Sequence, residues 1–225
     1  MLPARIDRLV ERVCSTAPVL ASLSSFGASG ARGAMIGETR EAIEAYCVAV
    51  GLVVYEWNDL HEKLARLFAL IREGVKRESL TEWYAIRSDT KQREKLRCAI
   101  IETTSGRWKK SPRAPDDLKW LLDRADKLAN DRNNAIHTPC SLYLRGDGSS
   151  EVMAAVRSAN AGNRRAKDFE REDLLTEFHW CAAYTVRLGQ FAGMLAPAMA
   201  FPDHNEWPGR PKIPSRADLS RVSRG

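Results

Sequence analysis

The chain has 225 residues, of which 44% are hydrophobic and 28% charged, and its 35 Lys and Arg against 29 Asp and Glu give a net charge of +6. This composition is typical of one compact globular domain with appendages, and it excludes a wholly disordered chain. The five cysteines form no C-x-x-C pair, so we expect reduced thiols and neither a zinc ribbon nor a disulfide scaffold. The excess positive charge favours an anionic partner, nucleic acid first.

The chain contains no obvious membrane span. Its longest uncharged apolar stretch, residues 45–55, has about 11 residues, whereas a span needs roughly 20. Charged side chains such as Asp7 and Arg8 interrupt the region that would be apolar in a signal peptide. We therefore expect a cytoplasmic protein that does not associate with membranes.

The first third of the chain predicts a lead-in followed by a long helix. Residues 1–37 are expected to form a short helix over residues 3–13 and then a flexible loop rich in Ser, Gly and Ala over residues 22–37. From residue 38 to Gly74, apolar residues recur every three or four positions, which indicates one packed helix. This seam comprises Val50, Val53, Trp57, Leu60, Leu64, Leu67 and Ile71. His61, next to the seam, is expected to be a surface or half-buried histidine.

The rest of the chain predicts further helices and one hairpin. Residues 79–104 favour one or two helices, with Asp89 as N-cap of the second. A basic loop over residues 105–115 precedes a strong amphipathic helix that starts at Asp116 and ends before Pro139. Alternating apolar residues around a Gly-Asp-Gly turn predict a β-hairpin over residues 141–156. A last long helix is expected from Asp168 to Pro197.

The predicted fold is therefore an all-α bundle of four to five helices with a small β-hairpin insertion. We expect the bundle to span residues 38–199. Residues 200–225 are rich in Pro and Arg and are expected to form a flexible C-terminal tail without a core of its own.

The most informative residue is an arginine on the apolar face of the predicted helix before Pro139. The seam of that helix passes through Leu121, Ala125 and Leu128, and the next position in the series is Arg132. Because an unpaired buried guanidinium is very costly, Arg132 must meet an acid, reach solvent in a cleft, or receive an anionic ligand. His137 lies five residues on, and Asn133 lies four residues before His137 on the same face.

Arginine, asparagine and histidine at one cleft would suit the handling of a phosphate. An arginine holds phosphate oxygens with a fork of two N–H groups, and histidine is the side chain best suited to proton transfer near neutral pH. Asn133 would orient one of the two partners.

These residues resemble a known family. Arg132, Asn133 and His137 match the R-N-x-x-x-H pattern of HEPN domains (higher eukaryote and prokaryote nucleotide-binding). The likeness extends over about residues 40–196 as an order of helices, and it includes the T-K-Q-R segment at residues 90–93. HEPN proteins are all-α bundles that usually dimerise, and many are metal-independent ribonucleases of toxin–antitoxin, abortive-infection and CRISPR systems.

The resemblance implies a homodimer in which both copies line one cleft, where RNA is cut by attack of its own 2′-hydroxyl. It implies that Arg132 clamps the phosphate and the transition state, that His137 is the acid or base, and that Asn133 is a polar orienter. An antitoxin or another defence-system protein would be a further partner.

A second interpretation stays open. Arg132 would then pair with Asp131, Asp126 or an acid on another helix, and His137 would cap its own helix end. The protein would be a non-catalytic helical dimer that serves as a nucleotide-binding or protein-interaction module. Within one ideal helix His137 lies about 140° from Arg132, so the two meet only through an irregular last turn or a second subunit.

The basic loop gives a second, less specific indication of nucleic-acid binding. Its cationic and aromatic side chains, which would guide an RNA backbone and stack a base, are Arg107, Trp108, Lys109, Lys110 and Arg113. A solvated loop without a ligand is the simpler interpretation. The chain has no phosphate-binding loop, dinucleotide fingerprint or E-x-x-H pair, so we expect neither a cofactor nor a metal site.

Overall fold

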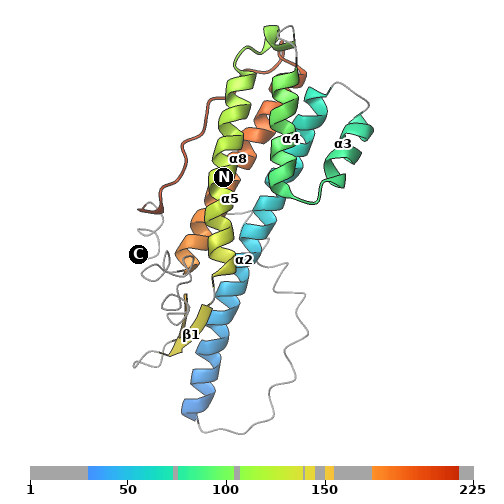
Figure 1. Cartoon of the computed structure of the whole chain (residues 1–225). Helices are drawn as coiled ribbons and strands as arrows, with labels where there is room; N and C mark the ends of the chain where they lie inside the picture. Colours follow the sequence, from blue (N-terminus) through green and yellow to red (C-terminus); the bar gives the residue numbers. More distant parts are fainter. Residues whose placement is uncertain are drawn as a thin grey trace.

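The structure, a computed structural model, describes residues 30–72, 76–103, 107–138, 140–144, 150–154 and 174–217. It confirms the all-α bundle. Its elements are α2 (Gly30–Ile71), α3 (Lys76–Ala85), α4 (Asp89–Glu102), the short 3-10 helix η2 (Arg107–Lys110), α5 (Ala114–His137), β1 (Cys140–Leu144), β2 (Ser150–Ala154) and α8 (Leu174–Ala200). Figure 1 shows α2, α5 and α8 running alongside one another, with α3 and α4 against the upper half of α2.

The core lies where the apolar faces of α2, α5 and α8 meet. The predicted seam of α2 is buried from Val53 to Ile71, and it packs on α8 along much of its length. Fully buried side chains from the three helices include Leu60, Leu64, Phe68, Leu118, Leu121, Leu122, Phe178, Leu188 and Phe191. Removal of this apolar surface from water is the main force that holds the helices together.

The start of α2 differs from the sequence-based expectation. Residues 30–37, which were expected to lie in a loop, belong to the helix, which begins at Gly30. Ala31, Ala34 and Met35 are good helix formers, and extending an existing helix costs far less than starting one, so the glycines are tolerated. The helix predicted over residues 3–13 lies outside the described residues.

Residues 79–104 form two helices, α3 and α4. The N-cap of α4 is Ser88, one residue before the expected Asp89, and its hydroxyl accepts a hydrogen bond from the backbone N–H of Lys91. Asp89 is instead the first residue of α4, where its carboxylate accepts the N–H of Thr90 at 2.7 Å. The connection therefore places an acidic side chain at the lower end of α4, facing α2 and α5.

The hairpin is confirmed with slightly shifted bounds. β1 and β2 pair antiparallel, with Leu142 opposite Val152 and Cys140 opposite Ala154. Val152 is buried, and β2 contacts the lower part of α2. The predicted end of α8 at Pro197 is also shifted, because the helix runs on to Ala200 and the N–H of Phe201 bonds to the Pro197 carbonyl.

The prediction of a flexible C-terminal tail is wrong for residues 201–217, which we call the C-terminal strap. The strap is extended and runs beside α5 in Figure 1. Its upper part binds Asp117, which is 1% exposed, through Trp207 Nε1 at 2.7 Å and Arg210 Nε at 2.5 Å. Its lower part binds the buried Glu177 through both Nε and Nη2 of Arg216.

Two physical effects fix the strap. A buried carboxylate is stable only when it is paired, and the strap supplies the cations for Asp117 and Glu177. The strap's prolines restrict the free chain, which lowers the entropy lost on docking. Packing adds to this, since Arg216 lies 3.8 Å from the centre of the Trp180 ring and Trp180 Nε1 donates to the Pro214 carbonyl.

Two further observations concern the setting of the protein. None of the described helices is both long and apolar enough to cross a bilayer. Cys47, Cys98 and Cys140 are exposed free thiols, whereas Cys181 is buried and its burial raises the pKa of the thiol.

Candidate functional site

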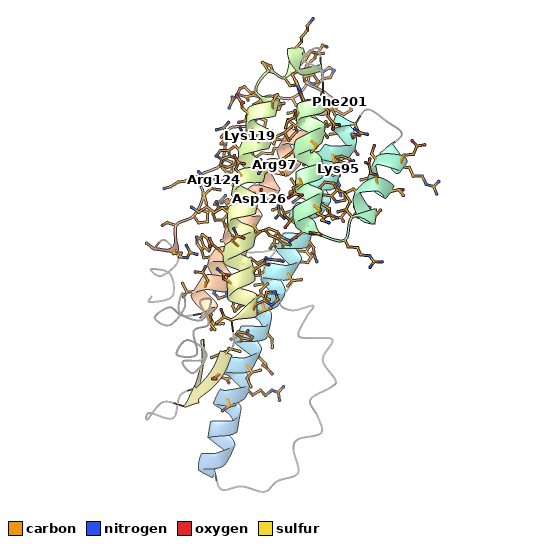
Figure 2. The ribbon with its side chains drawn as sticks, in the orientation of Figure 1. Lys95, Arg97, Lys119, Arg124, Asp126 and Phe201 are labelled. Carbon is orange, nitrogen blue, oxygen red and sulfur yellow. The ribbon has the colours of Figure 1, made fainter. Side chains whose placement is uncertain are left out.

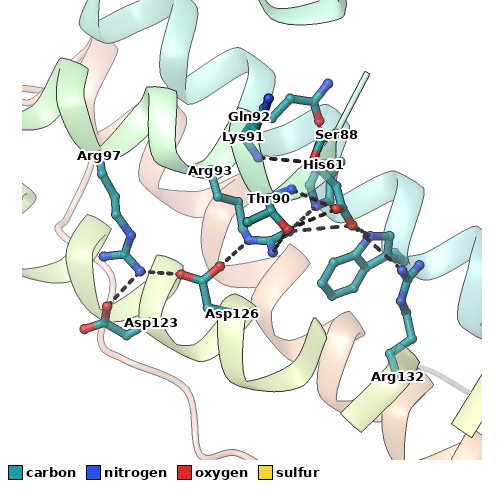
Figure 3. A network of polar contacts seen from close by, with 12 residues as sticks. His61, Ser88, Thr90, Lys91, Gln92, Arg93, Arg97, Asp123, Asp126 and Arg132 are labelled. Atoms are coloured by element: carbon teal, nitrogen blue, oxygen red, sulfur yellow. Dashed lines mark hydrogen bonds and ion pairs between the residues drawn. The ribbon is translucent and has the colours of Figure 1, made fainter. Parts of the chain in front are cut away.

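A buried arginine, Arg93, organises a polar network where α2, α4 and α5 meet (Figure 3). Its side chain is 2% exposed, and its Nε donates to Asp126 on α5 at 2.6 Å. Arg97, one turn further along α4, donates to the other oxygen of Asp126 at 2.7 Å. Burial alone would raise the pKa of Asp126, but the hydrogen bonds from both arginines outweigh it, so this pKa is lowered.

His61 is a buried member of the same network, which corrects the expectation of a surface or half-buried histidine. The amide nitrogen of Gln92 donates to the carbonyls of Trp83 and Ile86, so the Gln92 oxygen is left to accept from His61 Nδ1 at 3.1 Å. Nδ1 therefore carries the proton, and Nε2 accepts from Arg93 Nη1 at 3.2 Å.

This arrangement holds His61 in its neutral form. Burial is the main cause of its lowered pKa, and the neighbouring Arg93 acts in the same direction. Both ring nitrogens are engaged, so His61 serves to orient Arg93 and is not a free acid or base.

Arg132 lies at the edge of this network and is much less well paired than Arg93. Both guanidinium groups face the ring of Trp57, Arg132 at 4.6 Å and Arg93 at 5.5 Å from the ring centre. Arg132 Nη2 donates to the side-chain oxygen of Asn133 at 2.6 Å, and its distance to Asp89 Oδ2 is 3.8 Å. Its Nε is buried and has no hydrogen-bond partner among the described residues, although the side chain as a whole is 18% exposed.

Of the partners expected for Arg132, the two acids on its own helix are engaged elsewhere, and the third possibility, an acid on another helix, is realised at 3.8 Å by Asp89. Asp126 binds Arg93 and Arg97, and Asp131 lies 3.5 Å from Arg216 of the C-terminal strap. The Asp89 carboxylate also accepts a hydrogen bond from Trp57 Nε1 at 3.1 Å, so Arg132 does not have this acid to itself.

The local charges leave room for an anion beside Arg132. Burial raises the pKa of Asp89, but the charge of Arg93, together with Arg132 and the backbone N–H of Thr90, outweighs it, so this pKa is lowered and the carboxylate is shared between two arginines. Burial also lowers the pKa of Arg132, Asp89 opposes this, and Arg93 adds to it. A guanidinium with one free buried N–H and a distant counter-ion suits an incoming oxyanion, which would supply the missing acceptor and charge.

The structure does not bring Arg132 and His137 together within one chain. α5 continues as a regular helix through His137, so five residues still separate the two side chains by about 140° around its axis. His137 is exposed in the last turn. Within the described part of the chain, no hydrogen bond or ion pair joins it to Arg132. Asn133, by contrast, contacts Arg132 directly, as an orienting side chain would.

The basic loop places its residues in different surroundings. Lys109 and Lys110 are exposed, and Lys110 pairs with Asp203 at 2.7 Å. Trp108 is half-buried against the core, and Arg113 precedes α5 with its Nε 3.7 Å from Asp117. The side chain of Arg107 lies outside the described part of the structure.

Sequence reasoning missed the residues that surround Arg132. Arg132 was identified as a charged residue on the apolar seam of a helix, and the same pattern applies to Arg93. Arg93 precedes Leu96 and Ile100 at the spacing of the apolar seam of its own helix. His61 and Trp57 gave no such signal, since an aromatic residue on a seam usually packs in the core.

Comparison with protein-family models, with curated proteins and with solved structures finds no match for this chain. Within the described residues, no three His, Cys, Asp or Glu side chains form a group that could hold a metal ion.

Proposed function

We propose that this protein is a metal-independent endoribonuclease of the HEPN type that acts as a homodimer. In this proposal Arg132 binds the scissile phosphate, Asn133 orients Arg132, and His137 transfers protons. A cytoplasmic role in toxin–antitoxin or phage defence, with an antitoxin or other defence-system partner, follows from the resemblance to that family.

The proposal rests mainly on the difference in pairing between the two arginines that face Trp57. Arg93 is fully engaged by Asp126, His61 and neighbouring oxygens. Arg132 stacks on the same Trp57 ring, but in the described part of the chain its buried Nε has no acceptor and no carboxylate lies closer to it than 3.8 Å. A half-buried guanidinium without a close counter-ion is costly unless a ligand completes it, and a phosphate matches its fork of donors.

The chemistry needs no group beyond these side chains and the RNA. The 2′-oxygen attacks the adjacent phosphorus, and the bond from phosphorus to the 5′-oxygen breaks. One proton leaves the 2′-hydroxyl and one reaches the departing 5′-oxygen, so the products are a 2′,3′-cyclic phosphate and a 5′-hydroxyl. A histidine can perform either transfer, and Arg132 would stabilise the negative charge that develops on the phosphoryl oxygens.

A second copy of the chain is required because Arg132 and His137 face different sides of α5. Among the described residues, the lower half of α2 has an exposed side below the start of α4 (Figure 1), whose first residue, Asp89, contacts Trp57. Apolar and small side chains follow one another along that exposed surface, namely Ile43, Cys47, Gly51, Val54 and Tyr55. Within the described residues, an added Cβ at Gly51 would meet no atom within 4 Å, which would let a second helix approach closely there.

The test is cleavage of RNA in the presence of EDTA. We expect the protein to cut total RNA and to leave 2′,3′-cyclic phosphate ends. Arg132→Lys keeps the charge but loses the fork and should reduce cleavage strongly, and His137→Ala should abolish it. His179→Ala, which removes another exposed histidine, is the matched control and should cleave as the wild type does.

The outcomes separate the proposal from its alternative. Cleavage that persists in both Arg132→Lys and His137→Ala, or that EDTA abolishes, would overturn the mechanism. If Arg132→Ala dissociates the dimer or lowers the helical far-UV signal, Arg132 has a structural role and the non-catalytic helical dimer is the better description.

A further inference from the structure

A hollow of about 650 Å³ lies at the end of the bundle remote from Arg132. It opens between η2 and the turn that follows α8, two segments about 90 residues apart in the sequence. Figure 2 shows Phe201 at this end, well above Asp126. The lining residues that matter are Trp108, Lys109, Lys110, Phe201, Asp203 and His204. Its volume lies within the range of small-ligand sites.

The hollow has an excess of positive charge. Lys110 and Asp203 form an ion pair that joins the two segments, so these two charges largely cancel. No carboxylate in the described part of the chain pairs with Lys109, which is exposed at the same hollow, and His204 adds a second donor. An anionic group entering the hollow would therefore meet a cation that is not already neutralised.

The hollow also presents an aromatic ring. Phe201 is 61% exposed, which is unusual for a phenylalanine in a well-packed turn. Its backbone is fixed, because its N–H bonds to the Pro197 carbonyl and its own carbonyl accepts from Asn205. Trp108 also lines the hollow but packs partly against the core, so Phe201 is the more exposed of the two rings.

We propose that this hollow binds one nucleotide of a single-stranded RNA, with the base stacked on Phe201 and a phosphate on Lys109. Aromatic faces combined with unpaired cations are the usual means of holding single strands without regard to sequence. The proposal rests on the proposed function in so far as RNA is the ligand, and it adds a binding site that is separate from the residues that would cut.

The hollow lies far from Arg132 along α5, so only a long RNA could occupy both places. Arg132 lies 18 residues along α5 from Ala114, which corresponds to about 27 Å at 1.5 Å per residue. A short oligonucleotide bound at Arg132 cannot reach the hollow, whereas a long strand can occupy both. The hollow would therefore raise affinity for long RNA and leave the chemical step unchanged.

The binding experiment uses a labelled single-stranded 20-mer with 2′-O-methyl groups, which cannot be cut by attack of a 2′-hydroxyl. By fluorescence anisotropy we expect Phe201→Leu, which keeps an apolar side chain but loses the ring, to bind about five- to tenfold more weakly. Lys109→Ala should lower the slope of log affinity against log salt by about 0.7, the effect of one phosphate contact. The matched controls Ile101→Ala and Lys119→Ala alter an exposed apolar residue and an exposed lysine outside the hollow and should change neither quantity.

A second measurement separates this site from the cutting site. With a cleavable 20-mer, Phe201→Leu should raise KM and leave kcat unchanged, and with a tetranucleotide it should behave as the wild type does. Wild-type affinity for the 20-mer in both Phe201→Leu and Lys109→Ala would overturn the proposal. So would equally tight binding of adenosine monophosphate, which would make the hollow a free-nucleotide site. Binding that depends on Phe201 without any cleavage would overturn the nuclease proposal alone.

Discussion

The two arginines that face Trp57 should differ sharply in their contribution to stability. Methionine replaces either guanidinium with an unbranched apolar side chain that still fits against the ring. We predict that Arg132→Met changes the free energy of unfolding by less than about 1 kcal/mol, whereas Arg93→Met lowers it by about 3 kcal/mol. The difference follows from how completely each guanidinium is paired.

For Arg132 the favourable and unfavourable contributions nearly cancel. Stacking on Trp57 at 4.6 Å contributes about 1 kcal/mol, and the 3.8 Å ion pair with Asp89 contributes about 0.5 kcal/mol. Against this, a buried N–H without an acceptor costs about 1–3 kcal/mol, and Arg132→Met removes that cost. The bond to Asn133 is to an adjacent residue, whose amide can bond to water instead.

For Arg93 the contributions do not cancel. Arg93→Met leaves His61 Nε2 buried without a donor and deprives Asp126 of its bond at 2.6 Å. Breaking a buried charge pair costs about 3–5 kcal/mol, and the lower end applies because Asp126 is partly exposed and keeps Arg97.

The assay is urea unfolding followed by far-UV circular dichroism, at one protein concentration for all variants because the stability of the proposed dimer would depend on it. With a slope of about 2 kcal/mol per molar urea, Arg93→Met should lower the midpoint by about 1.5 M and Arg132→Met by less than about 0.5 M. A midpoint for Arg132→Met as low as that for Arg93→Met would refute the reasoning, because Arg132 would then be a structural residue.

Three further predictions concern the strap, pH and the dimer. Asp117→Ala removes a buried acceptor of two hydrogen bonds from the C-terminal strap. It should lower the free energy of unfolding by about 2–3 kcal/mol and expose the strap to limited proteolysis. An unchanged urea midpoint would contradict the stabilising role of the strap. Burial lowers the pKa of His61, so as pH falls below about 6.5 this histidine takes up a proton in the unfolded chain before it does so in the folded protein. The free energy of unfolding should therefore decrease from pH 7.5 to 5.5, by at most about 1.4 kcal/mol from this residue. In His61→Gln the urea midpoint should decrease correspondingly less over the same pH range. Val54→Lys should shift the mass measured by light scattering from dimer to monomer, whereas Ile101→Lys, at an 82% exposed site on α4, should not; a dimer that survives Val54→Lys uses another surface.

Much of the fold follows from the sequence because helix periodicity is a local property. The apolar seam of α2 and the apolar face of α5 consist of residues three or four positions apart in the sequence, and burial of those residues holds the bundle together. The hairpin follows from alternation around a glycine-containing turn. The same periodicity identified Arg132 as a charge on an apolar face, which is the basis of the candidate site.

Only the tertiary structure decided which charges meet. Asp117 and Glu177 are ordinary surface-type residues by sequence, and they are buried because Arg210 and Arg216, some 90 and 40 residues further on, fold back as a strap to pair with them. Likewise, Asp126 pairs with Arg93 and leaves Arg132 to the more distant Asp89. Electrostatic pairing depends on distances between elements far apart in the chain, and no local pattern of residues encodes those distances.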